Sequence, residues 1–241
     1  MLKLTGFSLV IMLFSVTMAA GEGAIAGKVT WEGKPIRGGK IRMDADPNCA
    51  ALHKKAPRNE EIVMTKDGKL RNVFIYVKDG LPEKKYEVPT EPVVLNQKGC
   101  VYKPHIWGVM AGQPITIMNS DDTAHNVHAM PKKNGEFNKP QPKKGLKMTR
   151  VFKKAEQHIP IKCDVHPWMG SYCFVMDHPF YAVSAKDGTY EIKGLPPGKY
   201  TVAAWQEKYG TQEGVVEVKD SSAAMLDFKF SKDSKATTRA K

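Results

Sequence analysis

The segment Ile161-Lys-Cys-Asp-Val-His-Pro-Trp-Met169 places a thiol (Cys163), an imidazole (His166) and a thioether (Met169) at a regular spacing of three. Soft sulfur ligands beside imidazole suit copper, especially Cu(I). Two His and one Cys with a weak axial Met form the blue-copper site. Three of those four ligands can come from this one short loop. The fourth must be a His from elsewhere in the chain.

His125 is the best candidate for that fourth ligand. Ile115 and Ile117 alternate with polar or flexible neighbours, which predicts a strand ending in the turn Asn119-Ser-Asp-Asp. A His just past such a strand end can point into a pocket capped by the Cys163 loop. His128 lies nearby and stays open as an alternative.

The order His125-Asn126-Val127 followed by Cys163-x-x-His166-x-x-Met169 resembles the cupredoxins, the blue copper proteins that include amicyanin and plastocyanin. The resemblance implies that His125, Cys163, His166 and Met169 hold one type 1 copper ion. It also implies that Asn126 ties the two ligand loops together. In the family, the His that corresponds to His166 lies nearest the surface, and electrons leave through a hydrophobic patch.

The C-terminal third shows a second pattern. Asp187-Gly188 starts one predicted strand, and Leu195-Pro-Pro-Gly198 leads into another. This resembles the carboxypeptidase regulatory-like (transthyretin-like) β-sandwich, which usually begins with a strand like Ile25–Trp31 and a Gly-x-Pro turn. We therefore expect that module to span residues 24 to 230 and to be interrupted by, or packed against, the copper domain. Proteins with this combination are often labelled methylamine utilization proteins, but no residue here identifies methylamine.

No sustained helical period appears after residue 20, so the sequence predicts an all-β fold: a cupredoxin-like Greek-key sandwich with a transthyretin-like sandwich. Within it, Asn72–Val77 is apolar on both faces, which predicts a strand buried on both sides. Pro131–Lys147 is predicted to be a mobile surface excursion. The expected divisions are a signal peptide (1–20), a first module part (24–60), a copper domain (61–179), a second module part (180–230) and a disordered tail (231–241).

The four cysteines are assigned to three roles: a metal ligand, a disulfide pair and a free thiol. Cys163 is assigned to metal. Cys49 and Cys100, each beside turn residues, form the natural disulfide in an oxidising compartment. Cys173 lies in a predicted strand and is expected to be a buried thiol, although it could pair with Cys49 or Cys100 instead.

The first twenty residues combine Lys3, a short apolar run and small residues at the end, which is typical of a secretory signal peptide. The alternative is an uncleaved anchor. We expect a periplasmic or secreted protein that does not span the membrane after cleavage. The formal net charge of +12 favours an acidic partner surface, such as that of a c-type cytochrome or a dehydrogenase. Export and the lack of interleaved aromatic residues argue against nucleic acid.

Together these observations predict a one-electron carrier rather than an enzyme. Multicopper oxidases need further His clusters, and the remaining histidines show no His-x-His pairs. A nucleophilic Cys163–His166 dyad would leave Met169 unexplained. Two alternatives remain: a copper carrier or sensor, and an envelope module that binds carbohydrate or protein and keeps copper as a structural ion.

Overall fold

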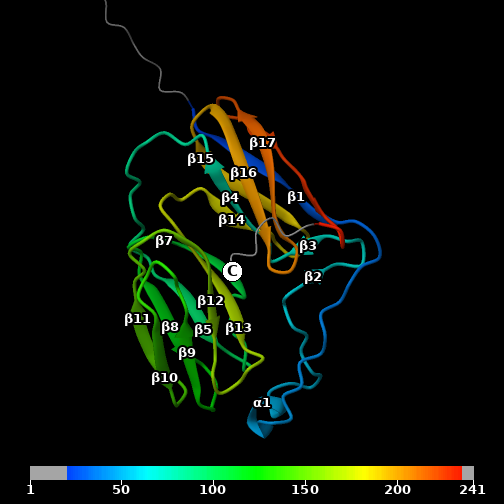
Figure 1. The fold of residues 1–241 in the computed structure, drawn as a ribbon, viewed down its shortest axis with the longest axis vertical. Helices are drawn as coiled ribbons and strands as arrows, with labels where there is room; N and C mark the ends of the chain where they lie inside the picture. The colour runs from blue at the N-terminus through cyan, green and yellow to red at the C-terminus, as the bar shows by residue number, and fades with distance from the viewer. Residues whose placement is uncertain (1–20, 235–241) are drawn as a thin grey trace, which may run out of the picture.

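Strand pairing divides the computed structural model, which describes residues 21–234, into two β-sandwiches in contact with each other (Figure 1). The predicted all-β class is confirmed, because one short helix accompanies nineteen strands in this range. Among the described residues, no helix is long and apolar enough to cross a membrane. The predicted signal peptide and the end of the predicted tail, from residue 235, lie outside the described residues.

The first unit, called here the terminal sandwich, is built from both ends of the chain. One of its sheets has the order β15-β1-β18, with β19 also paired to β1, and the other has the order β14-β4-β16-β17. Alternating apolar residues such as Ile25, Val29 and Ile192 face the core between the two sheets. The strands are β1 (Gly23–Trp31), β4 (Phe74–Asp79), β14 (Tyr181–Val183), β15 (Thr189–Leu195), β16 (Gly198–Gln206), β17 (Gly210–Val218), β18 (Ala223–Met225) and β19 (Phe228–Phe230).

The second unit, called here the inserted sandwich, lies between β4 and β14 in the chain. Its sheets have the orders β10-β9-β12-β13-β7 and β11-β8-β5-β6. Its core includes Leu95, Ile117 and Val127 together with Cys163 and Met169. The strands are β5 (Val93–Gln97), β6 (Tyr102–Lys103), β7 (Ile106–Met110), β8 (Ile115–Asn119), β9 (His125–Ala129), β10 (Phe137–Gln141), β11 (Lys147–Arg150), β12 (Glu156–Lys162) and β13 (Gly170–Met176).

β4 explains how the two sandwiches meet. Val73, Ile75 and Val77 face the core of the terminal sandwich, whereas Phe74 and Tyr76 face the inserted sandwich. The ring of Phe74 stacks on that of Phe174 in β13, with centroids 3.9 Å apart. Both faces of this strand are therefore buried, as its composition predicted.

The strand pairing places two segments differently from the expected divisions. β4 pairs with β14 and β16 and so belongs to the terminal sandwich, although the copper domain was expected to begin at residue 61. Conversely, Ile41, Met43 and Cys49 pack into the core of the inserted sandwich. Residues 41–53, which we call the cover segment, contain α1 (Pro47–Ala51) and are tied to that sandwich by the Cys49–Cys100 disulfide. β2 (Val63–Met64) and β3 (Leu70–Arg71) form a small hairpin after it.

The segment Pro131–Lys147, which is rich in lysine and is called here the Lys-rich stretch, also differs from expectation, since it forms β10 and the start of β11 rather than a mobile excursion. β10 pairs with β9 along its length. Pro140 is tolerated because β10 is an edge strand, where one missing N–H costs no ladder hydrogen bond. Composition alone suggested a loop, and pairing with a neighbouring strand overrides it.

Candidate metal centre

Three predicted ligands from two separate strand ends meet in the interior of the inserted sandwich. His125 begins β9, and Cys163 and His166 lie in the loop between β12 and β13. Their donor atoms lie within 4.8 Å of one another, and all three residues are buried. The Nδ1 atoms of His125 and His166 are 3.0 Å apart, and Cys163 Sγ lies 3.9 Å from His166 Nδ1.

Two carboxylates fix the orientation of the rings. His125 Nε2 lies 3.1 Å from Asp121 Oδ2, and His166 Nε2 lies 2.9 Å from Asp46 Oδ2. A carboxylate only accepts hydrogen bonds, so Nε2 of each ring carries the proton. In the neutral rings, each Nδ1 is left as a lone-pair donor facing the other. Carboxylate–histidine pairs of this kind hold the imidazoles of metal sites in place.

This donor set fits a single ion. In well-characterised sites, metal–nitrogen bonds of about 2.0 Å and metal–sulfur bonds of about 2.3 Å allow donors up to about 4.3 Å apart around one metal. The separations between the two rings and between Cys163 and His166 fall inside that limit. Two His and one Cys are the equatorial set that favours copper.

Asn126 joins the two ligand strands through its side chain. Its Oδ1 accepts a hydrogen bond from the backbone N–H of Asp164 at 2.7 Å and lies 3.2 Å from Cys163 Sγ. Its Nδ2 donates to Asp164 Oδ2 at 3.0 Å and to Asn138 Oδ1. The side chain therefore connects β9 to the Cys163 loop.

Electrostatics around the thiol favour its ionised form. Burial raises the pKa of Cys163, but the hydrogen bond with His125 and backbone N–H groups outweigh burial and lower that pKa. For His125, burial lowers the pKa, but the bond to Asp121 and the neighbouring Cys163 raise it overall. A thiolate is the form of Cys that binds a metal.

Met169, the fourth predicted ligand, lies at the other end of the loop. It is 1% exposed and belongs to the same core cluster as Cys163. Its backbone N–H donates to the carbonyl of His166 at 2.9 Å, and its carbonyl accepts from the N–H of Cys163 at 3.3 Å. The loop thus closes on itself and holds the three side chains as one unit.

His166 is not the surface residue that the resemblance implied. It is only 2% exposed. The cover segment lies over it, with Asp46 bonded to its Nε2 and Cys49 Sγ 3.5 Å from the same atom. The flanking Val165 is 55% exposed, so the loop reaches solvent beside His166 rather than through it.

Two other groupings of metal-binding residue types adjoin this site, and neither is a better site. One joins Asp46 and His166 with Cys49, and the other joins Asp121 and His125 with Cys100. Both cysteines belong to the disulfide and have no thiolate to offer. His128, the alternative to His125, instead pairs with Glu136 at 2.8 Å and Asp164 at 3.1 Å.

Sequence reasoning missed the two carboxylates and the cover segment. Asp121 was assigned to a turn, and Asp46, 120 residues before its partner, was given no role at the site. A signal for Asp46 existed in Asp46-Pro-Asn-Cys, where the side chain caps α1 by accepting from Asn48 and Cys49. That pattern predicts a helix start, but not what the helix covers.

Comparison with solved structures returned partial, low-scoring similarities. A purple cupredoxin from Nitrosopumilus maritimus is 20% identical, covering 35% of this chain and 99% of its own, with a TM-score of 0.31. A Cu(I) form of an amicyanin variant is 24% identical over 42% of this chain and 98% of its own, with a TM-score of 0.32. A copper-containing nitrite reductase from Thermus scotoductus is 17% identical over 41% of this chain, with a TM-score of 0.34.

The matched region spans about a quarter of that nitrite reductase, 25% of its length. No protein-family model matches the sequence. No curated protein matches it either.

Proposed function

We propose that the protein is a type 1 copper protein that carries single electrons between redox partners. The observation that carries this proposal is the buried cluster of His125, Cys163 and His166 with both imidazole Nδ1 atoms turned inward. Met169 is the axial ligand of this proposal. A copper ion bound there would supply a one-electron couple between Cu(I) and Cu(II).

The protein's own contribution is a fixed set of donors. Asp46 and Asp121 hold the two rings, and Asn126 holds the Cys163 loop. Burial of all three donor residues excludes water from them. A site that does not rearrange suits electron transfer, because little reorganisation accompanies the change of charge. A copper carrier, in contrast, needs ligands that exchange.

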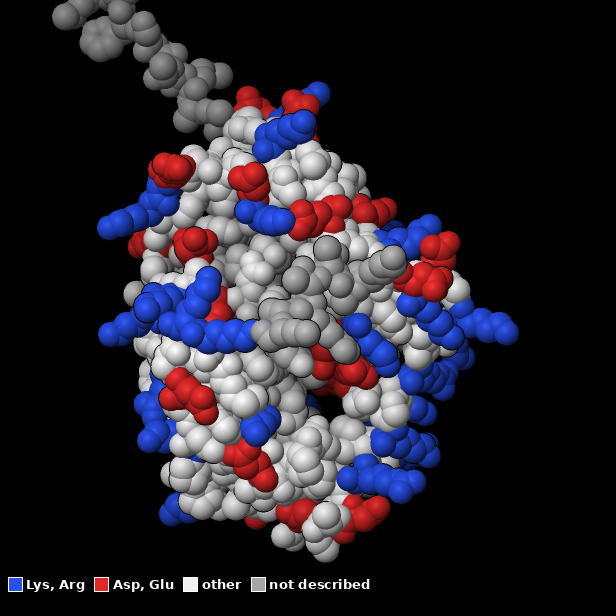
Figure 2. Space-filling model, viewed as in Figure 1, with Lys and Arg blue, Asp and Glu red and all other residues white. Residues whose placement is uncertain are grey.

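Partner and compartment belong to the same proposal. The net charge of +12 favours a redox protein with an acidic docking surface, a c-type cytochrome or a dehydrogenase. Figure 2 shows Lys and Arg side chains gathered along the edge where the segment between β1 and β2 runs. A disulfide is typical of the periplasm or the extracellular space.

The terminal sandwich is, in this proposal, a transthyretin-like module. Asp187-Gly188 precedes β15, and Leu195-Pro-Pro-Gly198 forms the connection from β15 to β16. Its role is to carry the inserted sandwich and to supply β4 as the strand on which that sandwich packs.

Copper loading tests the site. The loaded protein is expected to show an intense visible absorption that disappears in Cys163→Ser. Cys173→Ala is the matched control, since it removes the other free thiol, which lies in β13, and should keep the colour. Met169→Leu should keep the colour and raise the reduction potential. An unchanged spectrum in Cys163→Ser, or an unchanged reduction potential in Met169→Leu, would contradict the ligand assignment.

A kinetic comparison separates electron carrier from copper carrier. We expect electron self-exchange to be fast and Cu(I) transfer to a chelator to be slow. Slow electron self-exchange together with fast Cu(I) transfer would favour a copper carrier. Loss of physiological function in Cys163→Ser, rather than loss of colour alone, would exclude a purely structural role for the ion.

A further inference from the structure

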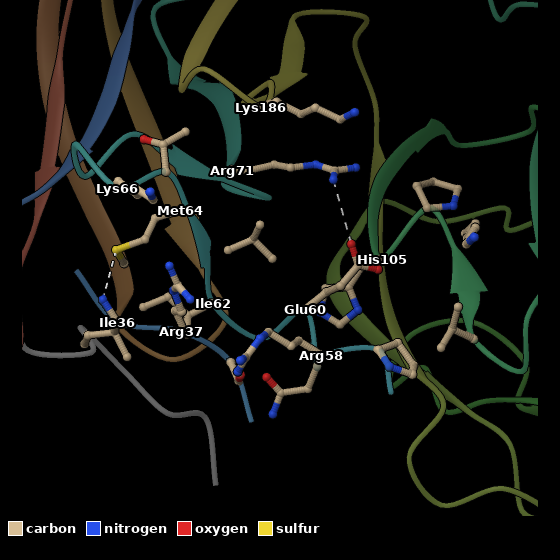
Figure 3. A pocket seen from close by; sticks show the side chains of 18 of the residues that line it. Ile36, Arg37, Arg58, Glu60, Ile62, Met64, Lys66, Arg71, His105 and Lys186 are labelled. Atoms are coloured by element: carbon tan, nitrogen blue, oxygen red, sulfur yellow. Dashed lines mark hydrogen bonds and ion pairs between the residues drawn. The ribbon is translucent and has the colours of Figure 1, made fainter. Parts of the chain in front are cut away.

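A large cavity lies between the two sandwiches, away from the metal centre. Its volume is about 1030 Å³, which is at the upper end of the range for small-molecule sites. The connection from β1 to β3 forms most of its wall, and residues 103–105 close it from the inserted sandwich. Ile36, Ile62 and Met64 give the wall an apolar part (Figure 3), and Val101 also lines it.

The charge of the lining is strongly one-sided. Among the described residues that line it, Glu60 is the only acidic one, and it lies 3.9 Å from Arg71. Figure 3 shows Arg71 and Lys186 extending across the cavity, with Arg71 directed toward Glu60. Six lining residues are permanent cations, Arg37, Arg58, Lys66, Arg71, Lys103 and Lys186.

Most of these cations have no anionic partner in the part of the chain that the structure describes. Within residues 21–234, Arg37, Lys66, Lys103 and Lys186 form no ion pair. Like charges gathered around one cavity repel each other, and a bound anion relieves that repulsion. Arg58 already donates to the carbonyl of Gly38 at 2.7 Å, which holds its guanidinium at the cavity wall.

We propose that this cavity binds a small organic anion, a carboxylate on an apolar body. The cationic residues would receive the carboxylate, and Ile36, Ile62 and Met64 would contact the apolar body. Inorganic anions lack a group for the apolar wall, and neutral molecules lack a group for the cations. The cationic and apolar parts of the lining together therefore define the chemical class of the ligand.

The cavity also leads toward the metal-binding loop. A second cavity of about 260 Å³ shares Arg58, Asn59, Glu60, Val101 and His105 with the first and reaches Trp168, but Glu61 and Glu207 also line it, so the anionic group belongs in the first cavity. The indole N–H of Trp168 donates to the carbonyl of Cys100 at 3.0 Å, and its ring lies 5.0 Å from that of His166.

Calorimetric titration of the copper-free protein with 2-naphthoate tests the proposal, because it does not depend on the metal or on electron transfer. We expect 2-naphthoate to bind, and 2-naphthamide, its neutral analogue, to bind at least about tenfold more weakly. Arg37→Gln/Lys66→Gln should weaken 2-naphthoate binding by about tenfold, because it removes two unpaired and exposed cations of the lining.

Lys139→Gln/Lys147→Gln is the matched control. It removes the same charge from exposed positions on β10 and β11, outside the lining. The proposal is supported if only the lining variant loses affinity. It is overturned if 2-naphthoate does not bind, if the amide or inorganic phosphate binds as tightly, or if the control variant loses as much affinity.

Discussion

Asn126 is the residue on which the shape of the metal centre depends most. Its side-chain oxygen and nitrogen both contact the Cys163 loop, so these contacts connect β9 to a distant segment of the chain. It is 7% exposed and Cys163 is 1% exposed, so the sulfur of Cys163 would not find water in place of the Asn126 oxygen. Partners left unsatisfied in this way are the costly kind.

We therefore expect Asn126→Ala to lower the free energy of unfolding by about 1–3 kcal/mol and to make the Cys163 loop mobile. Urea denaturation of the copper-free protein measures the first effect, and broadening of the visible copper band the second. Asn138→Ala is the control, because Asn138 is exposed and bonds to the same network from its outer side. Equal effects of the two substitutions would refute this role for Asn126.

At this scale the sequence was informative because the ligands lie in short local patterns. Cys163, His166 and Met169 are three residues apart, and His125 precedes Asn126 directly. The carboxylates that orient the rings were not predictable in the same way. Asp46 reaches His166 only through the folding of a segment 120 residues away, and nothing in its local sequence specifies that contact.

The cover segment is the element that distinguishes this site from the expected one. It places α1 over His166 and is held there by the disulfide, by Asp46 and by a 2.8 Å contact between His53 Nε2 and the carbonyl of Gly99. His166 would otherwise lie nearer to solvent. The covalent bond makes this arrangement permanent under oxidising conditions.

Removal of the bond in Cys49→Ala/Cys100→Ala should lower the free energy of unfolding by about 4 kcal/mol on the chain-entropy model, since the sulfurs join positions 51 residues apart. It should also free the cover segment and speed the removal of Cu(I) by a chelator. Cys173→Ala serves as the comparison. Chelation at the wild-type rate in the double variant would mean that the segment does not control access.

Strands with regular alternation of apolar residues were predicted correctly. The predictions failed where pairing with a distant strand determines the structure. The strand at Asn72–Val77 was predicted correctly as doubly buried, but its membership in the terminal sandwich depends on its pairing with β16. The Lys-rich stretch gave no alternation, and its strands exist because β9 and β8 pair with them. A sequence without alignment carries little information on such distant pairings.

For the whole molecule, polar contacts fix the two sandwiches relative to each other beside the aromatic junction. His105 Nε2, from the inserted sandwich, lies 2.6 Å from Glu207 Oε2, which follows β16. Burial lowers the pKa of His105, but the bond to Glu207 outweighs it and raises that pKa above its usual 6.5. The pair is therefore expected to stabilise the junction through protonated His105.

The sign of the pH effect follows from that shift. A folded pKa above the unfolded one gives a stabilisation that is complete below about pH 6.5 and disappears as pH rises through the folded pKa. The wild-type protein should thus lose more unfolding free energy than Glu207→Gln between about pH 6 and about pH 9. Glu213→Gln, which breaks an exposed pair with Lys78, is the control. Parallel pH profiles for wild type and Glu207→Gln would disprove the coupling.

The position of β1 has a consequence for synthesis of the chain. Among residues 21–234, this first strand pairs with β15, β18 and β19, and with an earlier segment only through a bridge between Thr30 and Lys69, so its strand partners are made after residue 188. The strands of the inserted sandwich, in contrast, all lie between residues 93 and 176. During synthesis, the inserted sandwich can thus fold before the partners of β1 have been made. The pairing of β1 with the C-terminal strands, which closes a long loop and is therefore slow, comes last.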